Sequence, residues 1–239
     1  MAIELPQPVV DLLQVIGINW PQVNEDKVRE FATHVREFAS NIEDTHSQVN
    51  STLQDVGQAY QGNSYQLLIS KWAALSQNHM TELLDACKVL GTALDGAADA
   101  IVGLKVEAIA ELVVMAATFV ADQAAAVVTF GASEAALPLI EEAAEKLVDF
   151  LTQQLVQVVI GQVVNVALNP LLDLIAKAAN GMMFSALEDM LGVGSGPGSS
   201  FSMDPDTVIA HSARFGEYSN TVQQHAQTFS ANVSGLSFS

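Results

Sequence analysis

The feature that most constrains this chain is a pair of long apolar stripes joined by a short connection. Apolar or small side chains recur at gaps of 3 or 4 over residues 28–56, and the same spacing resumes over residues 68–97. Such gaps place these side chains on one side of a helix. Each helix would be about 50 Å long at about 1.5 Å per residue and would need a partner beside it. Because the connection is short, the two helices are predicted to pack as an antiparallel hairpin.

The predicted hairpin helices span residues 24–56 and 64–97, with Asn24 as N-cap of the first and Gly57 as its C-cap. His46 and His79 fall near the seam and would interrupt its apolar packing. The expected hairpin core consists of the larger apolar side chains of both stripes: Val28, Phe31, Val35, Phe38, Ile42, Leu68, Trp72, Leu75, Leu83 and Leu90.

The rest of the chain up to residue 191 also has helical character. A short helix before Gly17 is expected, and Gly91, Gly96 and Gly103 are expected to weaken or bend the second hairpin helix late. Residues 104–130 are apolar on nearly every face, which predicts a helix buried on several sides. Further helices are expected over 134–168 and 171–191, and no strand is predicted. The fold class is therefore all-α, a hairpin extended into a helical bundle.

A Gly/Ser-rich stretch divides the chain near its end. Residues 192–203 hold Gly-Val-Gly-Ser-Gly-Pro-Gly-Ser-Ser, the composition of a flexible linker. Asp204 and Pro205 then have the residue types of an N-cap and a first helical position. The predicted domains are a helical bundle over 1–191, the linker over 192–203, and a tethered C-terminal helix with a tail over 204–239. Limited proteolysis is expected to cut the linker first and separate that helix.

Charge and composition exclude several kinds of partner. The 9 Lys+Arg face 27 Asp+Glu, a formal charge of −18. Nucleic acids and anionic membrane surfaces bind clustered cations, so neither is an expected partner. The nearest approach to a membrane span is Phe150 to Leu172, but its many amides predict a helix packed within the bundle. The N-terminus lacks the basic and apolar regions of a secretory signal peptide.

Motifs that carry catalysis or cofactors are not recognisable in the sequence. There is no phosphate-binding glycine loop, nucleophile elbow or zinc-protease motif, and the histidines never fall three or four apart. Cys87 has no activating base near it in sequence and is expected to be a small buried residue. Glu141, Glu142 and Glu145 are expected to form a solvated helix face. We therefore predict no catalytic, cofactor-binding or metal site, and no enzyme activity.

The connection between the two stripes carries a family resemblance. Tyr60-Gln61-Gly62 resembles the Trp-x-Gly turn of the WXG family of type VII secretion substrates, with tyrosine in place of tryptophan. Residues 5–190 resemble the N-terminal helical domain of larger actinobacterial type VII proteins, most closely at 20–27 and 59–65. In the best-known of these, that domain is described as an outer-membrane channel and precedes a toxin. A structural reading stands beside this one: Gly62 would allow a positive φ, and Tyr60 would close the end of the hairpin.

The resemblance implies a function without catalysis. The chain would be a type VII secretion substrate or adaptor, a targeting domain that accompanies or precedes an effector. Its partners would be the secretion machinery and a helical protein, either a second copy or a small WXG-like protein, in a dimer or heterodimer. It would be cytoplasmic before export and then secreted or on the cell surface. The alternative, from a different class, is pore formation by residues 100–190 after export.

The resemblance also implies a secretion signal of the form Tyr-x-x-x-Asp/Glu after the second helix. Tyr218 is the tyrosine that follows Tyr65, and the position four residues after it is Val222. Either a partner protein supplies the signal, or the chain is not exported by this route.

Overall fold

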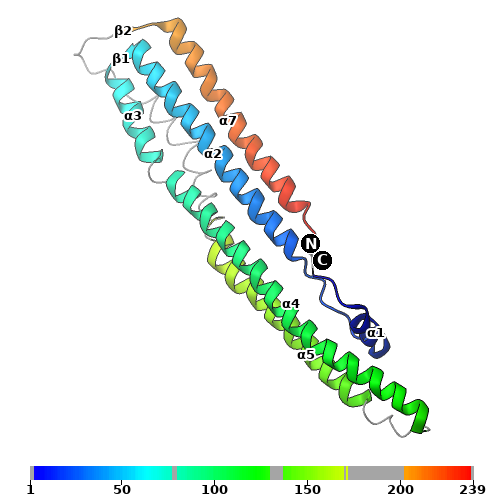
Figure 1. Cartoon of the computed structure of the whole chain (residues 1–239). Coiled ribbons are helices and arrows are strands. Elements are labelled where there is room, and N and C mark those ends of the chain that lie inside the picture. Colours follow the sequence, from blue (N-terminus) through cyan, green and yellow to red (C-terminus); the bar gives the residue numbers. More distant parts are fainter. Residues whose placement is uncertain (1–2, 77–79, 130–136, 170, 172–201, 238–239) are drawn as a thin grey trace. The chain divides into compact units, whose positions relative to one another are not determined.

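The computed structural model describes residues 3–76, 80–129, 137–169, 171 and 202–237 (Figure 1). The elements are α1 (Gln7–Ile16), α2 (Glu25–Ala59), β1 (Tyr60–Gln61), α3 (Asn63–Leu75), α4 (Thr81–Thr129), α5 (Leu137–Val158), the π-helical segment η2 (Val159–Leu168), β2 (Ser202–Met203) and α7 (Pro205–Ser234). The prediction of an all-α fold is confirmed. The chain divides into two compact units, which are described separately below: a first unit of Met1–Glu30, Ala93–Asn165 and Ser237–Ser239, and a second unit of Phe31–Thr92 and Val166–Leu236.

The hairpin of the second unit is antiparallel. The Tyr65 hydroxyl donates to the carbonyl of Leu53 over 3.0 Å, and Trp72 Nε1 donates to Asn50 Oδ1 over 2.6 Å. Residue numbers therefore rise along α3 as they fall along α2. Every position of the apolar stripe on α2 is buried, which is what a helix packed along its length requires: Val28, Phe31, Val35, Phe38, Ile42, Thr45, Val49, Leu53 and Val56.

The second hairpin helix, predicted over 64–97, corresponds to α3, which ends at Leu75, and α4, which begins at Thr81. Ser76 and Met80 are π-helical, and residues 77–79 lie outside the described part of the chain. The predicted end at residue 97 is wrong, because α4 runs without a break to Thr129, although a weak point and a new helix from 104 were expected. A glycine inside a helix costs only about 0.5–1 kcal/mol relative to alanine, which the burial of Leu90, Leu94 and Ile101 offsets.

A short β-ladder closes the end of the hairpin, although no strand was predicted. β1 pairs antiparallel with β2, Tyr60 opposite Met203 and Gln61 opposite Ser202. The Asp204 amide extends the contact by donating to the Ala59 carbonyl over 2.9 Å. Two-residue strands are too short to show an alternating pattern. The last two residues of the predicted linker are therefore hydrogen-bonded, and residues 192–201 lie outside the described part of the chain.

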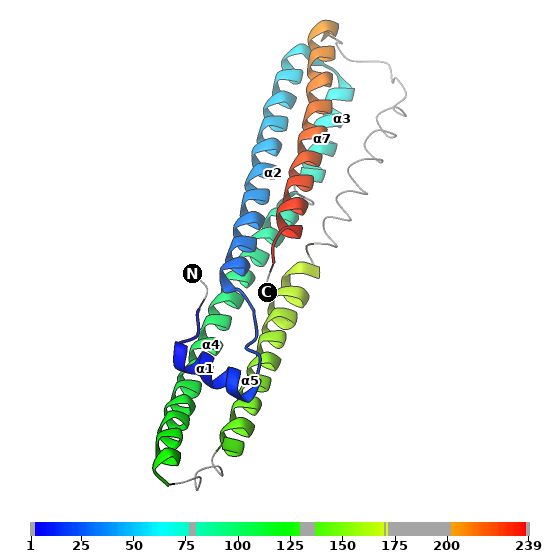
Figure 2. The ribbon, with the colours of Figure 1, turned by 90° about the vertical axis from the view of Figure 1, so that its right-hand side faces the viewer.

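α7 lies alongside α2 in the second unit, as Figures 1 and 2 both show. The ring of Phe229 stacks on Phe38, with centroids 4.9 Å apart, and lies 6.5 Å from the ring of Phe31. Nearer the ladder, the Tyr218 and Thr52 hydroxyls are hydrogen-bonded at 2.8 Å. The predicted cap is present, since Asp204 accepts from the Thr207 amide. The separability expected for this helix stays a prediction, and these contacts favour its remaining bound to α2 after cleavage.

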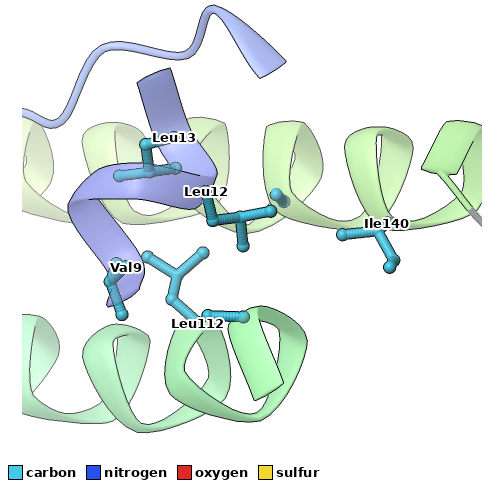
Figure 3. Close-up of a cluster of buried hydrophobic side chains, with 7 residues drawn as sticks. Val9, Leu12, Leu13, Leu112 and Ile140 are labelled. Carbon is cyan, nitrogen blue, oxygen red and sulfur yellow. The ribbon is translucent and has the colours of Figure 1, made fainter. Parts of the chain in front are cut away.

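The first unit has its core where α1 crosses α4 and α5 (Figure 2). Val9 and Leu12 of α1 point toward Leu112 of α4, with Ile140 of α5 beside them (Figure 3). Gly17 ends α1 in the left-handed conformation, φ 72°, which glycine adopts without steric cost. A short helix thus fills the space between two long ones.

The expectation that residues 104–130 are buried on several sides is wrong. Leu112 and Ala116 are buried, but Val106, Val113, Val114 and Val120 are exposed. The segment Phe150 to Leu172, expected to pack within the bundle, is also buried on one side and exposed on another. Leu151 and Leu155 are buried, while Phe150, Val156 and Ile160 face solvent. Residues 170 and 172 lie outside the described part of the chain. Hydropathy does not distinguish the covered face of such a helix from the uncovered one.

Gly57 lies inside α2 and does not cap it, because the helix continues to Ala59. A Cβ at residue 57 would lie 2.5 Å from Tyr65 Cζ, closer than carbon atoms can approach. The glycine therefore makes room for the ring whose hydroxyl binds the Leu53 carbonyl.

Gly57→Ala is expected to destabilise the chain by about 1 kcal/mol, because displacing Tyr65 outweighs the helix preference of alanine. In a Tyr65→Ala background the same change should instead stabilise by about 0.5–1 kcal/mol. Urea unfolding of the four proteins, followed by circular dichroism, measures both differences. An equal effect of Gly57→Ala in the two backgrounds would contradict the steric explanation.

Candidate interaction surfaces

The predicted hairpin core residues do not all lie equally deep. Leu68 and Trp72 of α3 are half-buried, and the side chain of Leu75 lies outside the description. The Trp72 ring stacks on His46, with centroids 5.6 Å apart. The others are buried: Val28, Phe31, Val35, Phe38 and Ile42 of α2, and Leu83 and Leu90 of α4.

The turn motif is a strand followed by a helix start. Tyr60 and Gln61 form β1, and Gly62 precedes the first turn of α3. Gly62 has φ 172° and ψ 170°, an extended backbone that any residue adopts, so the expected positive φ is wrong. A Cβ there would touch the Tyr60 ring at ordinary contact distances of 3.4–3.5 Å. Neither the backbone nor the space around it requires glycine at this position.

His46 marks the seam near the end of α3. Its Nε2 lies 2.5 Å from Ser76 Oγ, and its ring covers the Trp72 indole. Burial lowers the pKa of His46, and the nearby Glu43 carboxylate only partly offsets this effect. His46 is thus a neutral, hydrogen-bonded break in the apolar packing, while His79 lies outside the description.

A buried ion pair in the first unit was missed by the sequence analysis. Lys105 of α4 lies 2.7 Å from Glu25 at the start of α2, and both side chains are almost fully buried. Lys105 also donates to the Val23 carbonyl, and Glu25 accepts from the Ile3 amide over 2.5 Å. One signal could have revealed it: Lys105 continues the buried stripe of Ile101, Ala108 and Leu112 at gaps of 3 and 4. A charge on such a stripe needs a partner.

Cys87 is buried on α4, and burial raises its pKa to about 11. A thiol of that pKa carries almost no thiolate at neutral pH and is a poor nucleophile. Among the residues that the structure describes, no cluster of histidine, cysteine and carboxylate side chains could hold a metal ion. No helix within the described ranges is long and apolar enough to cross a membrane.

A groove of about 450 Å³ lies along α4 and α5 in the first unit. Its lining combines apolar side chains with two acidic residues and one lysine: Leu104, Glu107, Ala108, Glu111 and Met115 of α4, and Ala143, Lys146, Leu147, Phe150 and Leu151 of α5. Phe150 is 57% exposed at its edge. An open apolar trough between two helices has the shape that accepts a further helix.

Comparison with protein families decides the assignment. The model of the WXG100-like domain matches residues 4–147, which span α1 to the middle of α5 and cover more than half of the chain. The chain belongs to the WXG100-like domain family. This family consists of helical proteins that are generally not enzymes and that are secreted through type VII systems. No curated protein and no solved structure matches the chain.

The structure of this WXG100-like chain differs from a plain two-helix hairpin in two respects. α1 and α5 add a second core around α4, and α7 adds a third helix beside α2. The family match includes most of the first addition, since it extends to residue 147, and ends before α7.

Proposed function

We propose that this WXG100-like chain is a non-catalytic module that is exported through type VII secretion together with a helical protein partner. It would act as the targeting domain that accompanies or precedes an effector. The partner is a small WXG-like protein or a second copy, and the location is cytoplasmic before export and extracellular or cell-surface afterwards.

The single observation that carries this proposal is the family match over residues 4–147. Two features of the molecule support it. The helices leave large apolar side chains exposed on α4 and α5, including Val113, Val114 and Phe150, and such faces are typical of surfaces that bind a partner. Cys87 has a pKa too high for nucleophilic chemistry at neutral pH.

Pore formation after export is the second candidate, favoured by the same exposed apolar side chains. Dye release from neutral liposomes separates the two functions. An export module should leave the vesicles intact. A pore-forming domain should release the dye, whereas vesicles that receive neither protein nor detergent should retain it.

The export assay follows the chain in the culture medium of cells with and without the secretion ATPase, co-expressed with the genes next to its own. We expect the chain outside wild-type cells and not outside cells that lack the ATPase. A cytoplasmic marker protein controls for lysis. Equal amounts of the chain outside both strains would remove the export assignment and leave a helical scaffold.

A further inference from the structure

The groove along α4 and α5 has an unbalanced charge. Glu107 and Glu111 are exposed on α4 one helical turn apart, and neither forms an ion pair with any residue that the structure describes. Lys146, the lysine that lines the groove, is bound to Glu142 at 2.6 Å. Its charge is therefore largely neutralised, and the rim of the groove is negative.

The lining of the groove has the spacing of a helix-binding surface. On α4 the apolar positions 104, 108 and 115, with Glu111 of the rim between them, follow gaps of 4, 3 and 4, and on α5 positions 143, 147 and 150 follow gaps of 4 and 3. α1 shows how such a pair holds a helix, because Val9, Leu12 and Leu13 are buried against the adjoining stripe of Leu112 and Ala116. A third helix with its own apolar stripe can bind in the groove in a similar way.

A second copy of the chain is a poor occupant. Each copy carries a formal charge of −18, so two copies repel. Of its nine Lys and Arg side chains, five form an ion pair within the chain: Lys27, Arg29, Lys88, Lys105 and Lys146. A separate protein that supplies free cations is complementary to the rim.

We propose that this groove binds a basic amphipathic helix of a partner protein. Apolar side chains of that helix contact Met115, Leu147 and Phe150, and two lysines or arginines one turn apart contact Glu107 and Glu111. This inference rests on the proposed partner-binding function, since it names the chemistry of the partner and the surface that binds it.

The test uses the full chain and a labelled helical peptide of about 18 residues with leucines at gaps of 3 and 4 and lysines one turn apart beside them. A second peptide carries glutamates in place of the lysines. Fluorescence anisotropy should show binding of the lysine peptide at least about tenfold tighter than binding of the glutamate peptide. The double variant Glu107→Lys/Glu111→Lys should reverse that preference, and Phe150→Ala should weaken the binding of both peptides.

The matched control is Glu141→Lys/Glu145→Lys on α5. It makes the same change of charge at the same spacing on an exposed face that does not line the groove. Circular dichroism verifies that each variant keeps its helices. The control should leave the preference for the lysine peptide unchanged. An equal effect of the two charge reversals, or none from either, would overturn the proposal.

Two further outcomes also overturn it. A dimer in sedimentation that Phe150→Glu dissociates would assign the groove to a second copy, and flotation with neutral liposomes that Phe150→Glu abolishes would assign it to lipid. The export assay separates this inference from the function on which it rests. Peptide binding without ATPase-dependent export would support helix binding in the groove and contradict the secretion role. ATPase-dependent export without peptide binding would support the secretion role and contradict helix binding in the groove.

Discussion

Replacing Phe38 with alanine should lower the free energy of unfolding by about 3–5 kcal/mol. Phe38 is buried on α2, and its ring stacks on Phe229 of α7 with centroids 4.9 Å apart. The substitution removes the apolar contacts of the ring, leaves a cavity, and removes the aromatic contact between the two helices. Urea unfolding followed by circular dichroism measures the loss.

Two comparisons make this prediction specific. Phe150→Ala, the same change at an exposed position, should have a small effect, and Trp72→Ala should have a smaller effect than Phe38→Ala because Trp72 is only half-buried. In a double-mutant cycle, Phe38→Ala and Phe229→Ala should show a coupling of about 0.5–1.5 kcal/mol. A coupling of zero would mean that α7 does not pack on α2 in solution.

Lys105→Met should be the most damaging change in the first unit, at about 3–5 kcal/mol, because it leaves the buried Glu25 carboxylate without its cation. The double variant Glu25→Leu/Lys105→Met removes both charges and should recover most of that loss. The control is Lys88→Met on the same helix, where the ammonium is exposed and lies 3.4 Å from an exposed Asp85 carboxylate. It should change stability little. If the double variant is no more stable than Lys105→Met, the role of Lys105 is not to neutralise Glu25.

The same ion pair makes stability depend on pH. Burial raises the pKa of Glu25, but hydrogen bonds from Lys105 and from the Glu25 and Ile3 amides more than offset it, so the pKa lies below its ordinary value of 4.5. Glu25 therefore stabilises the folded chain fully above its unfolded pKa, and this contribution is lost as the pH falls through the folded pKa.

In Lys105→Met the burial remains without the cation, so the pKa of Glu25 should rise above its unfolded value. The free-energy cost of burying the ionised Glu25 carboxylate then destabilises the variant at neutral pH, and this cost disappears when the carboxyl is protonated. The stability difference between the wild type and Lys105→Met should be smaller near pH 4 than near pH 7. A difference that is the same at both values would show that the lost contact is not electrostatic.

Local patterns in the sequence determined much of the fold. The stripe from Val28 to Val56 predicted which face of α2 is buried, because successive side chains at gaps of 3 and 4 share one face of a helix whatever covers it. The helix ends followed in the same way: Asn24 accepts from the Lys27 amide over 3.2 Å, and Gly17 ends α1. These signals lie within one or two turns of the chain, so neighbouring residues suffice to specify them.

Contacts between distant residues were decided only by the tertiary structure. Glu25 and Lys105 are separated by 80 residues, and Thr52 and Tyr218 by 166. The sequence around one residue of such a pair does not identify the other. The same holds for the apolar α4, where α1 covers Leu112 while Val113 and Val114 face solvent. Periodicity states that a helix has an apolar side, but which side is covered depends on where the other helices pack, and that is a property of the whole chain.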